Sequence, residues 1–200
     1  MTSAQSHTPL SHESLMSLEQ YAKVRPEFRA KVMEHKKSRR VAIGPDATLY
    51  FEDRLTLQYQ IQEMLRIEKV FEADGIQDEL DAYNPLLPTG ANWKATFMLE
   101  YPDAEHRAQM LGKLLGIDKL VWVRIDGFDK VHPITNEDME RETEDKTSSV
   151  HFMRFELSPD MVAAAKSGAK IAMGVDHSAY SHQVGEINDA VRASLVSDLA

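Results

Sequence analysis

Three cationic side chains recur at alternating positions of separate β-rich runs. Lys94, Arg124 and Arg154 fall on the same face of their predicted strands, opposite the apolar positions. If these strands are neighbours, the cations converge and could hold a phosphate or carboxylate, because arginine offers either group a bidentate fork. Three further residues with the same alternation complete this candidate binding site: Glu156, Trp122 and Phe152.

The two aromatic rings of this candidate site could stack on a planar ligand. An exposed tryptophan beside a phenylalanine also forms an apolar patch that requires a covering helix, a partner or a ligand. The ordinary alternative is a solvated face with cross-strand ion pairs, each contributing about 0.2–1 kcal/mol. The loop over residues 84–92 could cover this face as a lid.

Histidine and carboxylate side chains give a second candidate, a metal site. His151, Asp176 and His177 are the candidate ligands, and His182 follows in the same stretch. Imidazole and carboxylate groups bind iron or zinc, and histidine also serves in acid–base catalysis because it titrates near neutrality. The spacing fits no common ligand template, and the alternative is structural histidine satisfied by one hydrogen bond.

Two charge runs complete the candidates. The basic run over 36–40 could steer an acidic partner, although a charge run at a helix end is usually solvated. The acidic run over 137–145 lacks the ordered oxygen spacing of a calcium loop. Neither run predicts a site by itself.

The sequence contains no common catalytic fingerprint. A glycine-rich phosphate loop, a Rossmann fingerprint, a nucleophile elbow and a zincin motif are all missing. The chain has no cysteine, which excludes disulfides, thiolate metal sites and cysteine nucleophiles. We therefore expect no cofactor, and the sequence leaves open whether the protein is an enzyme.

Charge and hydropathy narrow the class of protein. The formal net charge of −9 argues against general binding of nucleic acid or anionic lipid, because both require a basic surface. No apolar run approaches the roughly 20 residues of a membrane-spanning helix, and residues 1–17 lack the features of a secretory signal. We expect a cytoplasmic protein that binds neither nucleic acid nor membrane, and self-association remains open.

The elements that position these side chains follow from local patterns. Residues 1–16 are rich in serine, threonine and histidine and predict a disordered tail, followed by one α+β domain over 17–200. Ser17 and Gln20 form a capping-box pattern that begins a helix. A hairpin is expected over 41–51, then helices over 55–73, ended by Gly75, and over 77–83.

The remainder of the chain alternates strands and helices. Strands are expected over 93–101, 120–126, 150–157 and 170–175, with a short fifth strand over 130–134. Helices are expected over 104–115, 136–146, 160–166 and 185–199. One strand face is apolar and the other mixed, which predicts an α+β fold with a mostly antiparallel or mixed sheet of about five strands. Helices then pack on one face of that sheet.

Seven segments resemble a known family. They are RPEFR (25–29), HKKSRR (35–40), YQIQEMLR (59–66), DAYNP (81–85), NWKAT (92–96), KTSSVHF (146–152) and GVDH (174–177). Together they resemble the bacterial family catalogued as domain of unknown function 3501, over about residues 18–180. The resemblance supplies no activity and no catalytic residue.

The resemblance does imply a cellular context. Genes of the family often lie beside those for rubrerythrin-like di-iron proteins and iron–sulfur oxidoreductases. This gene neighbourhood implies a non-enzymatic accessory role in redox chemistry or peroxide stress, with a rubrerythrin-like or iron–sulfur protein as the partner. The alternatives are an anion-binding protein or enzyme that uses the charged sheet face, and a histidine–carboxylate metal protein.

Overall fold

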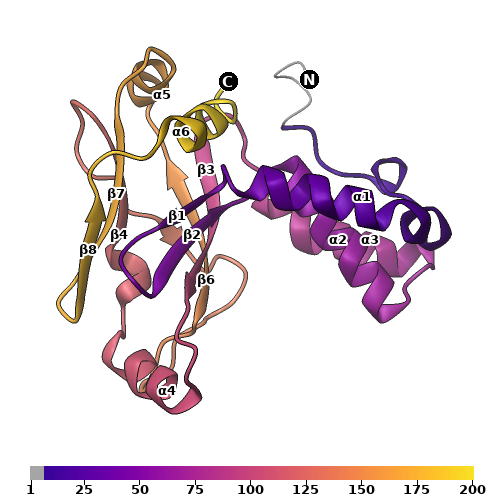
Figure 1. Cartoon of the computed structure of the whole chain (residues 1–200), viewed down its shortest axis with the longest axis horizontal. Helices are drawn as coiled ribbons and strands as arrows, with labels where there is room; N and C mark the ends of the chain where they lie inside the picture. Colours follow the sequence, from indigo (N-terminus) through magenta and orange to yellow (C-terminus); the bar gives the residue numbers. More distant parts are fainter. Residues whose placement is uncertain (1–6) are drawn as a thin grey trace.

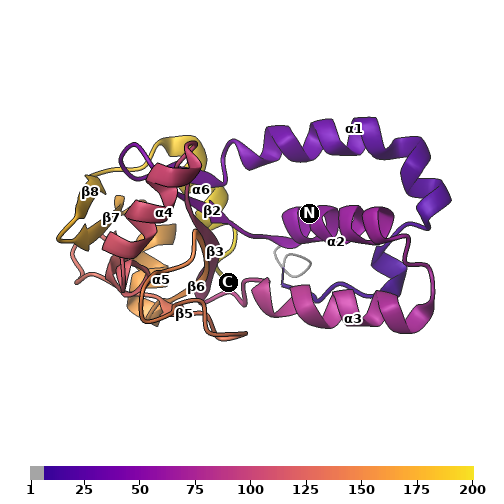
Figure 2. The ribbon, with the colours of Figure 1, turned by 90° about the horizontal axis from the view of Figure 1, so that it is seen from below.

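The protein consists of a helical lobe and a β lobe that lie side by side (Figures 1 and 2). The structure is a computed structural model and describes residues 7–200. The helical lobe contains α1 (Leu18–Lys36), α2 (Arg54–Glu68) and α3 (Ala73–Tyr83), with 3₁₀ turns at His12–Ser14 and Asn84–Leu86. None of the described helices is long and apolar enough to cross a membrane.

The β lobe contains two antiparallel sheets. The five-stranded sheet has the order β1 (Arg40–Ala42), β2 (Ala47–Phe51), β3 (Asn92–Leu99), β6 (Val150–Glu156) and β5 (Ile134–Thr135). The three-stranded sheet has the order β4 (Val121–Ile125), β7 (Ile171–His177) and β8 (Tyr180–Val184). Four further helices complete the lobe: α4 (Ala104–Lys113), a 3₁₀ turn at Ile117–Leu120, α5 (Pro159–Lys166) and α6 (Asp189–Val196). This α+β fold with a five-stranded antiparallel sheet confirms the predicted fold class.

The larger hydrophobic core lies between the two sheets. Trp93, Phe97 and Phe155 of the five-stranded sheet share it with Val123 and Met173 of the three-stranded sheet, and all five are 0% exposed. These residues occupy the apolar alternation of their strands, as expected from period two. The opposite face of the five-stranded sheet, here called the outer face, is therefore left for the helical lobe.

A second, smaller core lies within the helical lobe. Leu57, Ile61 and Leu80 pack there with Leu10. Leu10 is 3% exposed, and its backbone N–H and carbonyl bond the Asn84 side chain at 2.8 and 2.9 Å. A disordered tail was predicted over 1–16, and it stays a prediction, although Leu10 and its paired backbone lie against the helical lobe. Residues 1–6 lie outside the described residues, and a single domain over 17–200 stays a prediction.

Helix α1 begins where the sequence predicts, whereas the helix expected over 136–146 does not form. The Ser17 side chain accepts a bond from the Gln20 N–H at 3.2 Å, which confirms the capping box of α1. The helix expected over 136–146 is wrong: this segment is irregular apart from a bridge between Glu142 and Thr147. The density of like charge in this segment opposes a helix.

Other boundaries differ for local reasons. Helix α2 ends at Lys69, which has a left-handed φ of 56°, so Gly75 lies inside α3 instead of ending α2. Strand β8 was not predicted, because its outward residues are polar and hide the alternation. The strands over 120–126 and 170–175 form their own sheet with β8, because alternation predicts which residues share a face and not which strands pair.

Candidate functional site

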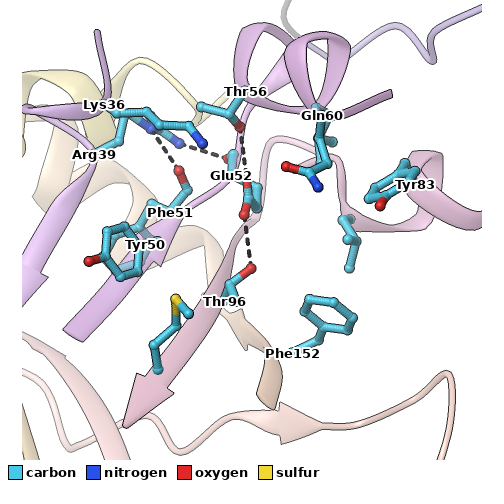
Figure 3. Close-up of a pocket in the computed structure, with 13 residues that line it drawn as sticks. Lys36, Arg39, Tyr50, Phe51, Glu52, Thr56, Gln60, Tyr83, Thr96 and Phe152 are labelled. Carbon is cyan, nitrogen blue, oxygen red and sulfur yellow. Dashed lines mark hydrogen bonds between the residues drawn. The ribbon is translucent and has the colours of Figure 1, made fainter. Parts of the chain in front are cut away.

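A cleft separates the helical lobe from the outer face of the five-stranded sheet. Its main cavity, of about 370 Å³, lies between the end of α1, the start of α2, the end of α3 and the sheet (Figure 3). This volume is in the range of small-molecule sites. Most of its lining is apolar or aromatic, including Phe51, Leu57, Leu86 and Met98.

The floor of this cavity is set by strand register. Tyr50, Thr96 and Phe152 are direct cross-strand partners on β2, β3 and β6, so their side chains stand in one row on the outer face. Direct partners have Cβ atoms about 4.5–5.5 Å apart. A threonine hydroxyl is thereby flanked by two aromatic rings (Figure 3).

One carboxylate lies at the centre of the cavity. Glu52 directly follows β2, and its backbone N–H bonds the Lys94 carbonyl at 2.8 Å, which continues the ladder. The Thr56 hydroxyl donates to Glu52 Oε2 at 2.6 Å, and the Thr96 hydroxyl donates to Oε1 at 2.9 Å (Figure 3). Helix and sheet therefore fix the carboxylate from opposite sides.

A buried arginine fixes the backbone that carries Glu52. The Arg39 side chain is 2% exposed and donates to the Phe51 carbonyl at 3.3 Å and to the Glu52 carbonyl at 2.8 Å. Its two terminal nitrogens bind Asp198 in a fork, at 3.0 and 2.7 Å. Asp198, two residues after α6, thus helps to position the cavity wall.

The first turn of α2 is also fixed at this point. Asp53 caps the helix by accepting the Thr56 N–H at 2.9 Å, and His35 Nε2 lies 2.5 Å from Asp53 Oδ2. Burial opposes ionisation of Asp53, but the bond from His35 and the charge of Arg39 hold its pKa below the usual value. Thr56 is therefore shared between the helix cap and the cavity carboxylate.

Three polar side chains complete the cavity wall: Lys36, Gln60 and Tyr83. Burial raises the pKa of Tyr83, which a hydrogen bond from Gln60 partly offsets. The Lys36 ammonium lies 5.6 Å from the centroid of the Tyr59 ring. A few polar groups around an apolar space is the usual composition of a ligand site.

A second cavity, of about 300 Å³, adjoins the first. Both are lined by Leu86 and Phe152, so they meet at these two side chains. The segment expected to cover this face contributes Leu86 to both cavities and Pro85 to the second. The charged side chains of the second cavity are Asp81, Lys94, Glu137, Asp138 and Arg154.

Two of the three predicted cations do meet here, and both already have partners. Lys94 and Arg154 are direct cross-strand partners. The Arg154 guanidinium binds Glu137 in a fork at 2.8 and 2.7 Å and also bonds Glu156. The Lys94 ammonium donates to the Pro85 carbonyl, and its pKa is lowered by burial and by Arg154. This pattern leaves little capacity for an anion.

The other two members of the predicted site lie elsewhere. Trp122 and Arg124 belong to β4 of the three-stranded sheet, so they do not join Lys94 and Arg154. Trp122 is 1% exposed and lies over Gly174, with the Lys130 ammonium 4.2 Å from its ring centroid. Convergence of the three cations was expected only if their strands are neighbours, and β4 lies in a different sheet from β3 and β6.

The predicted metal residues are held in other interactions. His151 is fully buried; its Nδ1 lies 3.1 Å from the Asn136 amide nitrogen and its Nε2 lies 3.0 Å from the Ser148 carbonyl. His177 Nε2 lies 3.1 Å from the Leu115 carbonyl, and its Nδ1 accepts the Ala179 N–H. Among residues 7–200, no group of three histidine, aspartate or glutamate side chains could hold a metal ion.

Asp176, the third predicted ligand, is also paired. Its carboxylate accepts a bond from the Lys130 ammonium at 2.6 Å, and that bond lowers its pKa. The ring nitrogens of His151 and His177 face backbone, amide or hydroxyl groups, as structural histidines do. The described geometry therefore favours the structural alternative for all three residues.

Comparison with known proteins places the chain in a family. The family model described as "Protein of unknown function (DUF3501)" matches residues 9–199. The chain belongs to the DUF3501 family. It is also similar to the crystal structure of a novel protein of unknown function from Burkholderia pseudomallei K96243. That match has 49% sequence identity and a TM-score of 0.92, and covers 96% of this chain and 100% of the other. No curated protein matches.

The membership confirms the family resemblance, but the central cavity residues of this DUF3501 protein were not predicted. Thr96 was visible as a member of the mixed strand face, yet it lacked a charged or aromatic side chain. Glu52 lies one residue beyond β2, where alternation no longer assigns a face. Only the pairing of β2 with β3 brings the two residues together.

Proposed function

We propose that this protein binds a small organic molecule with a flat apolar body in the cleft between its lobes. The observation that carries the proposal is the Glu52 carboxylate, held by two threonine hydroxyls inside an otherwise largely apolar cavity. A buried polar group in an apolar pocket fixes the orientation of a ligand, while the surrounding rings supply contact area. The Tyr50 and Phe152 rings provide that area on the floor.

This proposal differs from an anion site on the sheet face. The Arg154 guanidinium is already bound by two carboxylates, and Lys94 by a carbonyl. A phosphate would have to displace Glu137 or Glu156, and the displaced carboxylates would remain beside it. We therefore assign the ligand to the Glu52 cavity and not to the predicted cation cluster.

A fragment screen by two-dimensional amide NMR tests the proposal. Binding in the cleft should shift amide signals of residues 50–60, 83–86, 96–98 and 152 together. The variant Gln60→Trp places an indole in the cavity and should abolish these shifts. The variant Gln183→Trp, on an exposed position of β8, is the control and should retain them. Fragments that shift signals outside the cleft, equally in both variants, would contradict the proposal.

The accessory role in redox or peroxide-stress chemistry stays a prediction that rests on the gene neighbourhood of the family. Co-purification with the neighbouring rubrerythrin-like or iron–sulfur protein tests it, and no capture at micromolar concentration would count against it. A cytoplasmic location and self-association are likewise predictions. A ligand-binding protein is compatible with an accessory role, because ligand occupancy can control a partner interaction.

A further inference from the structure

The Glu52 carboxylate shares the cavity wall with Lys36 and Arg39 but forms no ion pair with either. Each Glu52 oxygen accepts one threonine hydroxyl, and a carboxylate oxygen has capacity for a second donor. Within residues 7–200, no lysine, arginine or histidine nitrogen lies within the 4.0 Å of an ion pair with Glu52. The carboxylate therefore has acceptor capacity but no cationic partner.

The two cations in the cavity wall are engaged elsewhere. The Arg39 fork is occupied by Asp198, and its hydrogen bond to Glu52 goes to the backbone carbonyl, so the Glu52 carboxylate acts on this arginine through charge alone. Lys36 lies over the Tyr59 ring in a cation–π contact. A carboxylate in a largely apolar space is costly without a counter-charge, and a ligand cation would supply one.

Aromatic rings surround the space beside this carboxylate. Tyr50, Tyr83 and Phe152 line the same cavity from β2, α3 and β6 (Figure 3). Ring faces attract cations through the ring quadrupole, and groups of aromatic rings are a common means of binding organic ammonium ions. A carboxylate among three rings is therefore complementary to a cation and not to an anion.

The approach to the cavity has the same preference. The adjoining cavity is lined by Asp81, Glu137 and Asp138, against Lys94 and Arg154. Arg154 pairs with Glu137, Asp138 pairs with Arg141, and Lys94 donates to the neutral Pro85 carbonyl. The whole chain has a formal net charge of −9, which favours the approach of cations.

We infer that the ligand of this cleft is an organic ammonium, whose cationic nitrogen binds Glu52 and whose apolar body lies on the Tyr50–Thr96–Phe152 row. This inference rests on the proposed function and specifies its ligand class. It also assigns Glu52 as the residue that determines specificity. Lys36 then acts against binding, because it places a like charge in the same wall.

Three probes of similar shape test the charge preference: 2-phenylethylammonium, 2-phenylethanol and 3-phenylpropanoate. Titration calorimetry or NMR titration should give the ammonium the lowest Kd, about tenfold below the alcohol, because charge-assisted hydrogen bonds are the stronger class. Glu52→Gln should remove this tenfold advantage while the alcohol still binds. Phe152→Ala should weaken binding of the ammonium and the alcohol alike.

Two further variants make the test specific. Glu100→Gln is the matched control, because Glu100 also accepts two outer-face hydroxyls, at 2.7 and 2.9 Å, but does not line the cavity. It should leave the ammonium preference unchanged. Lys36→Met should tighten ammonium binding by removing a like charge. Thermal unfolding of each variant shows whether the fold is retained.

The outcomes separate the inference from the proposed function. If the alcohol or the carboxylate binds best, Glu52→Gln has no effect and Gln60→Trp still abolishes binding, the cleft is a ligand site and the ammonium inference is wrong. Weaker ammonium binding by Lys36→Met would overturn the inference in the same way. If neither these probes nor the fragment screen shift signals in the cleft, both the function and the inference are wrong.

Discussion

Removal of the Arg39 guanidinium should destabilise the protein far more than removal of an exposed arginine. The variant Arg39→Met retains an unbranched stem but leaves Asp198, which is 4% exposed, without its ionic partner. Loss of one member of a buried ion pair costs about 3–5 kcal/mol. The same change also removes donors from the carbonyls of Phe51, Glu52 and Ser194.

The double variant separates these two contributions. Arg39→Met with Asp198→Leu removes the uncompensated charge but leaves the three carbonyls without their donor. Because an unsatisfied buried acceptor costs about 1–3 kcal/mol, we expect the second change to recover about 2 kcal/mol and not the full loss. With the single variant Asp198→Leu, the three differences close a double-mutant cycle that gives the coupling between the two side chains.

Acid pH should reduce the loss of unfolding free energy caused by Arg39→Met. Burial raises the pKa of Asp198, an effect that the charge of Arg39 opposes in the native protein. Without Arg39, the pKa of Asp198 in the folded protein rises further above its value in the unfolded chain. The destabilisation by the buried charge is therefore fully present at pH values above the folded pKa. It disappears as the pH falls to the unfolded value, because the protonated carboxyl requires no ionic partner.

Urea unfolding followed by tryptophan fluorescence measures these differences. Trp93 and Trp122 are 0% and 1% exposed and report on the two sheets, and the Trp93 indole bonds the Leu195 carbonyl of α6 at 2.9 Å. Arg40→Met is the control, since Arg40 is the exposed neighbour on β1 and should change stability by less than about 0.5 kcal/mol. A cost below about 1 kcal/mol for Arg39→Met would refute the reasoning.

Three other predictions concern packing and pH. A Cβ at Gly174 would lie 2.3 Å from the facing indole, so Gly174→Ala should lower the free energy of unfolding by about 1–3 kcal/mol. The control Gly185→Ala, with nothing within 4 Å, should change the midpoint little in thermal unfolding. Leu10→Ala should cost about 2 kcal/mol in urea unfolding, whereas a disordered tail predicts no change. The bond from Arg25 lowers the pKa of Glu63 from 4.5 to about 2, so its stabilisation is present above pH 4.5 and lost as the pH falls to 2. Glu63→Gln should remove this acid-dependent part of the stability profile, and an unchanged profile would contradict the assignment.

The sequence predicts local structure well where one residue type determines it. Helix α1 begins at the predicted capping box, and α5 begins at Pro159 with Ser158 as its N-cap. The apolar alternation also identifies the core face of each long strand correctly. These features depend on neighbours in sequence, so a single chain contains the information needed to predict them.

The sequence does not predict which strands pair or which lobe covers them. Arg124 has the same alternation as Arg154, yet the two residues lie in different sheets. Glu52 has no distinguishing pattern, because its role arises from Thr56 on a helix and Thr96 on a strand. Contacts between distant segments therefore determine the site, and local periodicity does not determine them.

The chain passes between the two lobes three times, over residues 36–40, 51–54 and 86–92. Arg39 in the first crossing bonds the Phe51 and Glu52 carbonyls of the second, and Lys94 bonds the Pro85 carbonyl beside the third. Three crossings with bonds between them restrict rotation of one lobe against the other. We expect a largely pre-formed cleft, in which a ligand loses little affinity to ordering the protein.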